Sequence, residues 1–117
     1  MNKTSVKERR AYERHDTRID IQGTADESGA VARMVASNLS LGGLYCTSTT
    51  DFPEMTRLAV RLMLPVSQAK PEPVDVEAVV VRREKKNGSN GDARYDLALY
   101  FPNLSERARG QIERYLS

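Results

Sequence analysis

Two arginines, Arg10 and Arg14, stand four positions apart in a segment that has no helical apolar stripe. In an extended or turned chain, residues at this spacing lie up to ~13 Å apart, so two guanidinium groups could hold different edges of one ligand. A guanidinium donates paired hydrogen bonds to phosphate oxygens or to the O6 and N7 atoms of guanine. The alternative is a solvated basic tail, because charge is common near a terminus.

A second run, Asn-Leu-Ser-Leu-Gly-Gly at residues 38–43, lies between two apolar segments. These residue types favour a β-turn for backbone reasons alone. The turn does not exclude binding, because glycine permits a close approach and consecutive backbone N–H groups form an anion-binding concavity. Asn38 adds a side-chain amide and Ser40 adds a hydroxyl. Together with the arginine pair, this run indicates a small anion-recognition site.

The elements that must position these residues are mostly strands. Apolar and polar residues alternate over most of the chain between residues 17 and 101, which is typical of half-buried β-strands. The alternation predicts strands near residues 18–22, 30–37, 44–47, 58–64, 74–83 and 95–101. Two loops are expected at 23–29 and 66–73, and a flexible hairpin connection is expected over 84–93.

The pattern changes to a helical period after Pro102, and either Asn103 or Ser105 could be the N-cap. Strands that hairpins can connect, followed by one helix, favour an antiparallel barrel or a sandwich with the helix packed against it.

Composition limits the possible classes of protein. A chain of 117 residues, 39% hydrophobic and 29% charged, is long enough for one self-supporting domain. No apolar run approaches the ~20 residues that span a bilayer, and the charged N-terminus is unlike a signal peptide, so we expect a cytoplasmic protein without membrane insertion. One cysteine and one histidine make an internal disulfide impossible and a zinc site improbable, so no metal is expected.

Arg-x-x-x-Arg before the first strand, followed by Asn-x-Ser-x-x-Gly in a β-rich chain, resembles the PilZ domain family over residues 8–116. The resemblance implies an all-β fold with a C-terminal helix, namely a six-stranded antiparallel β-barrel of the split-barrel type. It also implies a mobile N-terminal ligand-binding segment at residues 1–16, and a barrel with its helix at residues 17–117.

The resemblance further implies a ligand, the bacterial second messenger cyclic di-GMP, and no other cofactor. By position, the first arginines would hold guanine edges and phosphates, and the later run would form the opposite wall. The implied ligand-binding residues are Arg9, Arg10, Arg14, Asn38, Ser40 and Gly43. Arginine at the position of Arg9 is associated in the family with binding of a stacked ligand dimer.

The sequence departs from the family pattern at two points. Ala98 stands where the family often has glycine, and the chain has no tryptophan to stack on a guanine. Stacking would then fall to arginine planes or to the strand surface near Val81 and Arg82.

The expected function is a cytoplasmic receptor or adaptor, not an enzyme, that changes the conformation of its N-terminal segment and signals to a separate effector protein. In this family such partners govern motility, surface attachment and polysaccharide production. Ser40, His15 and Asp16 are the residue types of a catalytic triad, but the sequence has no nucleophile elbow, so we do not expect catalysis by them. Cys46 is expected to be a small buried residue.

Two other functions stay open from the sequence. One is a PilZ-like protein-interaction module that does not bind nucleotide, although the chain retains both motifs. The other is a weak RNA or single-strand binder, for which the strands are expected to lack an exposed aromatic platform. We therefore do not expect a nucleic acid polymer as partner.

Overall fold

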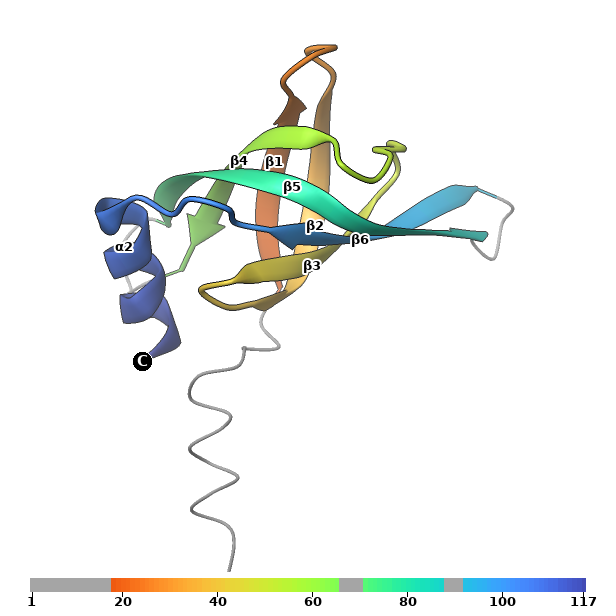
Figure 1. Ribbon diagram of the computed structural model, residues 1–117. Coiled ribbons are helices and arrows are strands. Elements are labelled where there is room, and N and C mark those ends of the chain that lie inside the picture. Colours follow the sequence, from red (N-terminus) through yellow and green to blue (C-terminus); the bar gives the residue numbers. More distant parts are fainter. Residues whose placement is uncertain (1–17, 66–70, 88–91) are drawn as a thin grey trace, which may run out of the picture.

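Six antiparallel strands close into a barrel in the order β1-β2-β3-β6-β5-β4, with one helix after them (Figure 1). The computed structural model describes residues 18–65, 71–87 and 92–117. The elements are β1 (Ile19–Ala25), β2 (Val31–Leu39), β3 (Gly43–Ser48), β4 (Arg57–Leu64), β5 (Glu72–Asn87), β6 (Ala93–Tyr100) and α2 (Glu106–Leu116). The six-stranded antiparallel barrel with a C-terminal helix, which the family resemblance implied, is confirmed. The alternation alone had left a barrel or a sandwich open, and the barrel is the observed architecture.

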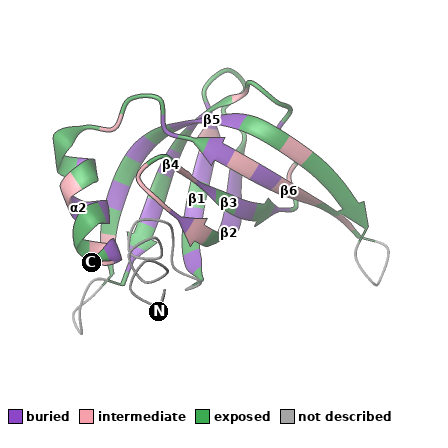
Figure 2. Ribbon diagram, turned by 60° about the horizontal axis from the view of Figure 1, so that its bottom comes forward, coloured by how far each residue is buried: buried purple, intermediate pink, exposed green. Residues whose placement is uncertain are grey.

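Alternate residues of the strands point inward and form the core of the barrel, except in the outer halves of β5 and β6, where no residue is buried (Figure 2). β4 shows this most clearly, because Leu58, Val60, Leu62 and Leu64 are all buried and alternate with exposed residues. Burying one face of each strand fixes its register, since a slip of one residue would turn every apolar side chain to solvent.

Cys46 lies in this core on β3, as expected from the sequence. Its Sγ atom is 3.8 Å from Sδ of Met34 on the neighbouring strand. Burial, and secondarily the charge of Asp96, raise the pKa of the thiol from 9.0 to about 12. Because the thiolate is the reactive form, Cys46 is a packing residue and not a nucleophile.

Helix α2 packs its apolar face against the barrel beside β5. The Ser105 hydroxyl accepts a hydrogen bond from the Ala108 amide at 3.0 Å, which identifies Ser105 as the N-cap among the two predicted candidates. Ala108 and Ile112 are buried, and the Arg114 guanidinium lies 3.2 Å from Glu72 at the start of β5. No helix in the described part of the chain is long and apolar enough to cross a membrane.

The β5–β6 hairpin is longer than the sequence predicts. Residues 84–93 were expected to form a flexible connection, but β5 continues to Asn87 and β6 begins at Ala93, where the two residues pair. The hairpin therefore projects beyond the other strands, at the end of the barrel away from α2 (Figure 1). The prediction was wrong because a solvated two-stranded ribbon needs no apolar alternation; its backbone ladder and cross-strand pairs, such as Lys86 with Asp96 at 3.5 Å, support it.

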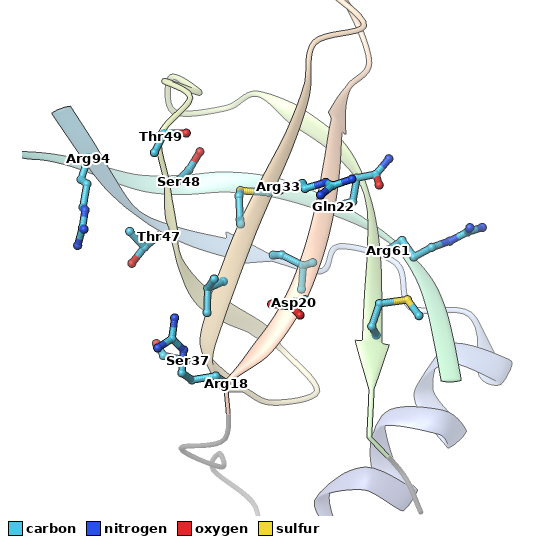
Figure 3. Close-up of a pocket in the computed structure, with 14 residues that line it drawn as sticks. Arg18, Asp20, Gln22, Arg33, Ser37, Thr47, Ser48, Thr49, Arg61 and Arg94 are labelled. Atoms are coloured by element: carbon cyan, nitrogen blue, oxygen red, sulfur yellow. The ribbon is translucent and has the colours of Figure 1, made fainter. Parts of the chain in front are cut away.

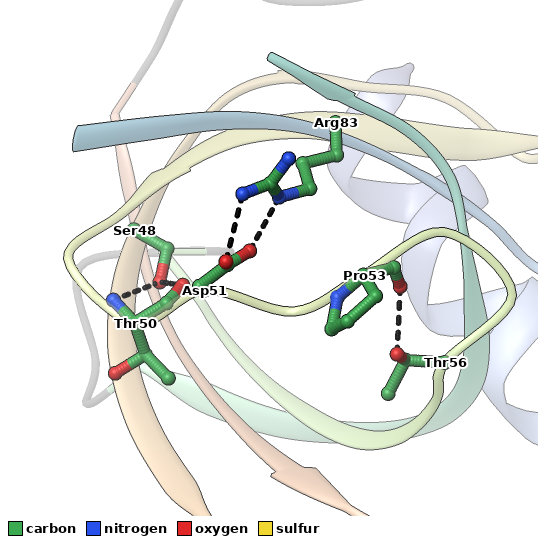
Figure 4. Close-up of polar contacts among 6 residues, drawn as sticks. All are labelled: Ser48, Thr50, Asp51, Pro53, Thr56 and Arg83. Carbon is green, nitrogen blue, oxygen red and sulfur yellow. Dashed lines mark hydrogen bonds and ion pairs between the residues drawn. The ribbon is translucent and has the colours of Figure 1, made fainter. Parts of the chain in front are cut away.

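A contact between Arg83 and Asp51 ties this hairpin to the loop that follows β3 (Figure 4). Arg83 donates two hydrogen bonds to the carboxylate, of which the Nη2 to Oδ2 bond is 2.7 Å long. Its guanidinium carbon also lies 5.2 Å from the centre of the Tyr95 ring. At the start of this loop, Ser48, the last residue of β3, accepts from the Thr50 amide at 2.9 Å, and within the loop Thr56 donates to the Pro53 carbonyl at 2.6 Å.

We expect the Asp51 contact to make stability depend on pH. The hydrogen bond from Arg83 lowers the pKa of Asp51 below its ordinary 3.8. A lowered pKa in the folded state stabilises the protein above about pH 4, and this contribution is lost as the pH falls through the folded-state pKa. Wild-type protein should therefore lose more of its free energy of unfolding between about pH 5 and pH 3 than Asp51→Asn does, as measured by urea unfolding at both pH values.

The matched control for this prediction is Asp26→Asn. Asp26 is an exposed aspartate in the turn after β1, and it forms no ion pair with any residue that the structure describes. Its variant should follow the wild-type pH dependence. Equal pH dependence of wild type and Asp51→Asn would show that the contact is broken in solution.

Candidate functional site

The residues 38–43 form the turn between β2 and β3, and Ser40 organises it. The Ser40 amide donates to the Gly43 carbonyl at 2.9 Å, and its hydroxyl donates to the same oxygen at 3.3 Å. The Gly42 amide in turn donates to the Ser40 hydroxyl at 3.2 Å. The turn interpretation of this run is therefore correct, and Ser40 keeps a lone pair that could still accept a hydrogen bond.

Gly43 is fixed in this turn by a close approach of two backbones. A β-carbon at Gly43 would lie 2.0 Å from the carbonyl oxygen of Leu99 and 3.2 Å from Cα of Tyr100. The Phe101 amide donates to the Gly42 carbonyl at 3.0 Å, so the end of β6 is bound to the turn as well. Only glycine fits at position 43 in this arrangement.

A groove of about 450 Å³ lies beside the turn on the outer face of the barrel. It brings Asn38, Ser40 and Gly43, the described members of the predicted site, together with residues of β3, β5 and β6. The other lining residues are Leu39, Gly42, Leu44, Tyr45, Val81, Ala98, Leu99 and Tyr100. Asn38 is half-buried, and its side-chain amide forms no hydrogen bond within the described residues, so it is available to a ligand.

Two β-bulges border this face and break the alternation of the sequence. The register of β2 against β3 shifts between Ala36 and Asn38, and the register of β5 against β6 shifts between Val80 and Arg82. Each bulge lets two consecutive residues point outward. In β2 these are Ser37 and Asn38, between buried Ala36 and Leu39, and in β5 they are Val81 and Arg82, after buried Val80. The regular alternation predicted neither bulge. The bulge in β2 could have been inferred from spacing, because the apolar residues Ala36 and Leu39 are three positions apart, whereas inward residues of a regular strand are separated by an even number.

Two tyrosines stand exposed on the same face, which corrects the expectation that the strands lack an aromatic platform. Tyr45 is 51% exposed on β3, and Tyr100 is 49% exposed on β6. Both line the groove. The alternation gave the signal for Tyr45, because its neighbours Leu44 and Cys46 are the inward residues of the strand.

Arg9, Arg10 and Arg14 lie outside the described residues, as do His15 and Asp16. The first described residues nevertheless show where the N-terminal segment joins the barrel. Ile19 pairs with Ala36, so Arg18 enters the barrel beside the end of β2, next to the turn at 38–43. Arg14 precedes Arg18 by four residues and cannot be more than ~13 Å of chain away from it.

A larger hollow of about 830 Å³ shares no lining residue with the groove beside the turn, and none of the described residues of the predicted site line it (Figure 3). Four arginines line it, namely Arg18, Arg33, Arg61 and Arg94. Arg33, Arg61 and Arg94 come from three different strands, and Arg18 immediately precedes β1. The four stand apart in Figure 3, and Arg61 is already held by Asp75 at 2.8 Å. These cations do not converge on one point, so we do not assign this hollow to the predicted ligand.

A family model described as PilZ domain matches residues 8–117 of this chain. The comparison with curated proteins found no match.

Solved structures show the same fold. The inhibitor of motility MotI/DgrA of Bacillus subtilis aligns with a TM-score of 0.69 at 22% identity, covering 90% of this chain and 48% of that one. The PilZ domain of Escherichia coli YcgR, solved with c-di-GMP, aligns at 0.61 and 20% identity, covering 84% and 79%. Apo MrkH of K. pneumonia aligns at 0.69 and 18%, covering 88% and 46%. The chain thus spans about half the length of the first and third of these proteins.

Proposed function

Because this chain belongs to the PilZ domain family, we propose that it is a receptor for cyclic di-GMP. The ligand would bind in the groove beside the turn at residues 38–43, with the N-terminal arginines on its other side. The structure of the YcgR PilZ domain with c-di-GMP supports this choice of ligand.

One observation carries the proposal: the chain enters the barrel beside the turn. Had β1 begun at the opposite end of the barrel, Arg14 could not have reached the groove. Instead Ile19 pairs with Ala36, two residues before Asn38. The two sequence motifs, more than twenty residues apart along the chain, can therefore act on one ligand.

Each residue of the proposed site has a role that its chemistry suits. Arg10 and Arg14 would hold phosphate oxygens and guanine edges through paired hydrogen bonds, and Arg9 would add charge and favour a stacked ligand dimer. Asn38 would offer its amide to a guanine, and Ser40 would accept a hydrogen bond through its hydroxyl.

Gly43 would act at this site through shape. The missing β-carbon allows the turn to approach β6, so that the turn and β6 together would form one wall of the ligand groove.

Binding would convert ligand concentration into a changed surface. The dianionic ligand would neutralise the N-terminal arginines, and residues 1–16 would order across the groove. The new surface would be recognised by an effector protein, and the chain itself would act as an adaptor without enzymatic activity. Regulation of motility or surface attachment in a bacterial cytoplasm would fit this role, and the similarity in fold to the Bacillus subtilis inhibitor of motility supports it.

The test is isothermal titration calorimetry with cyclic di-GMP, accompanied by nuclear magnetic resonance titration of ¹⁵N-labelled protein. We expect saturable binding, with the largest shifts in residues 8–18 and 37–46. Cyclic di-AMP is the control ligand. Absence of binding at millimolar ligand would refute the proposal and favour the protein-interaction module that does not bind nucleotide.

The exposed Tyr45 and Tyr100 favour one second candidate, binding to single-stranded nucleic acid, because bases stack on such rings. Salt distinguishes the two functions. Binding to a polymer releases many counterions and should weaken steeply as salt rises, whereas a small dianion in a formed groove should show a shallow slope. Fluorescence anisotropy with a labelled single-stranded oligonucleotide, at several salt concentrations, makes the comparison.

A further inference from the structure

We propose that one nucleobase of the ligand binds in a slot on the outer face of the barrel, stacked between Tyr45 and Arg82 with Ala98 as its floor. The inference rests on the proposed function, because a guanine of cyclic di-GMP is the base that would occupy the slot. It differs from the sequence expectation, in which no aromatic ring took part in stacking.

The sheet register places the three residues side by side. Tyr45 on β3 pairs with Ala98 on β6, and Ala98 pairs in turn with Arg82 on β5. The bulge between Val80 and Arg82 turns the Arg82 side chain outward, onto the face that carries Tyr45. All three residues line one hollow of about 300 Å³. Without the bulge, the guanidinium would not belong to this face.

The width of the slot suits a flat ring. Tyr45 and Arg82 are separated by two strand spacings, or roughly 10 Å. A planar base in contact with a group on each side needs about 3.5 to 4 Å per contact, so ~7 to 8 Å in total. Ala98 contributes only a methyl group between them, which leaves this space open. A longer side chain at position 98 would fill it.

Both walls of the slot are free to contact a ligand. Tyr45 exposes half of its surface. Arg82 forms no ion pair with any described residue, in contrast to its neighbour Arg83, which is held by Asp51. A guanidinium plane and a tyrosine ring both stack on a nucleobase.

The polar groups at one end of the slot favour guanine over adenine. The next outward row along the strands consists of Thr47, Asp96 and Glu84, about 7 Å from the row of Ala98. The Asp96 carboxylate is positioned by the Thr47 hydroxyl and the Lys86 ammonium, each at 3.5 Å. Carboxylates accept hydrogen bonds and donate none when ionised. Guanine presents N–H donors at N1 and N2 on one edge, where adenine has an unprotonated ring nitrogen and no 2-amino group.

The other end of the slot opens into the groove beside the turn. The 300 Å³ hollow and the 450 Å³ groove share Tyr45 and Ala98 as lining residues. A base in the slot can therefore belong to the same ligand whose remaining parts contact Asn38 and Ser40.

The test is calorimetric titration of cyclic di-GMP into three variants of the full chain. Ala98→Leu fills the slot and Tyr45→Ala removes one wall, so each should weaken binding about tenfold or more. Tyr45→Phe keeps the ring and should recover most of the affinity that Tyr45→Ala loses. The matched control is Ala59→Leu, the same change at an exposed position of β4, outside both hollows. Circular dichroism of each variant verifies that the barrel is folded.

Spectroscopy and base selectivity give independent readouts. Intermolecular nuclear Overhauser effects between the Tyr45 ring and the guanine H8 proton are expected. The double variant Glu84→Ala/Asp96→Ala should bind cyclic di-GMP less selectively over cyclic di-AMP than wild type does. Unchanged selectivity would overturn the part of the proposal that concerns these carboxylates.

The outcomes separate the slot from the proposed function. If wild type binds and Ala98→Leu and Tyr45→Ala bind equally well, the slot is overturned and the receptor function stands. If wild type itself does not bind, both are overturned. Loss of binding in the two slot variants, with Ala59→Leu unaffected, supports both.

Discussion

Replacement of Gly43 by alanine is expected to destabilise the barrel by about 3 kcal/mol or more, which is at the upper end of single substitutions that overfill a packed site. The added β-carbon would lie 2.0 Å from the carbonyl oxygen of Leu99. This oxygen belongs to a backbone that cannot shift cheaply, because Leu99 pairs with Leu44 on one side and with Val80 on the other. Relief of the clash would require breaking the ladder on at least one side of β6.

The adjacent glycine provides the control. A β-carbon at Gly42 would meet nothing closer than the Ser40 hydroxyl, at 3.9 Å, which is an ordinary contact. Gly42→Ala should therefore change the free energy of unfolding by less than about 1 kcal/mol. Urea unfolding followed by far-ultraviolet circular dichroism measures both variants. Similar stability of the two would mean that the approach of the turn to β6 is looser in solution than the structure shows.

This comparison also bears on what the motif is for. The sequence motif alone allows a role for Gly43 in contacting the ligand, in shaping the turn, or in both. The contact with Leu99 gives the glycine a structural role that would exist without any ligand. The glycine at position 43 is therefore explained by the structure of the turn, with or without a ligand. Asn38 is better explained by contact with a ligand, because its side-chain amide has no hydrogen bond within the described chain.

Most of the fold could be predicted from the sequence because one physical rule governs it. A strand with one buried face must alternate, and all six strands alternate strongly enough to be located. The helix was predictable for the same kind of reason, and Ser105 was one of two candidate caps. The alternation alone did not decide between a barrel and a sandwich, since pairing of β1 with β4 depends on contacts far apart in the chain. The resemblance to the PilZ domain family implied the barrel correctly.

The errors fall where alternation carries no information. The outer end of the β5–β6 hairpin is solvated on both faces, so its residues do not alternate between apolar and polar. The sequence therefore predicted a loop, although the strands continue as far as the pair Asn87 and Ala93. At each bulge the alternation of inward and outward residues is interrupted by one extra residue, such as Ser37 or Val81. One extra residue changes the sequence pattern too little to be detected. Both bulges border the groove, where a regular strand would direct fewer side chains outward.

The residues of the 38–43 turn could be predicted from the sequence, but the residues that other strands bring beside it could not. Asn38, Ser40 and Gly43 are close in sequence, so their meeting in one turn needed no tertiary information. Tyr45 and Arg82 flank Ala98 only because β6 lies between β3 and β5, which no local sequence pattern predicts. Arg9, Arg10 and Arg14 lie outside the described residues, and their part in the site stays a prediction.

Removal of both predicted arginines in Arg10→Ala/Arg14→Ala is expected to weaken binding of cyclic di-GMP by about a hundredfold or more. Hydrogen bonds to charged groups contribute about 1.5 to 3 kcal/mol each, and every 1.4 kcal/mol changes the dissociation constant about tenfold. The single variants should each weaken binding by about tenfold or more. Titration calorimetry measures all three.

A double substitution in the helix separates specific contacts from net charge. Arg107→Ala/Arg109→Ala removes the same two charges from exposed positions of α2, which does not line the groove. If binding depended only on the overall positive charge, this control would weaken it as much as the N-terminal double variant does. We expect the control to bind like wild type.

Lysine variants test whether the shape of the cation matters. Arg10→Lys and Arg14→Lys keep the charge but lose the planar fork that donates two parallel hydrogen bonds. Ordering the backbone of residues 1–16 on the ligand would cost roughly 1 to 2 kcal/mol for each residue fixed, and paired hydrogen bonds are what could offset it. Lysine should therefore recover only part of the lost affinity. Full recovery would indicate attraction of a mobile cation to the ligand, without the closure of the N-terminal segment over the groove.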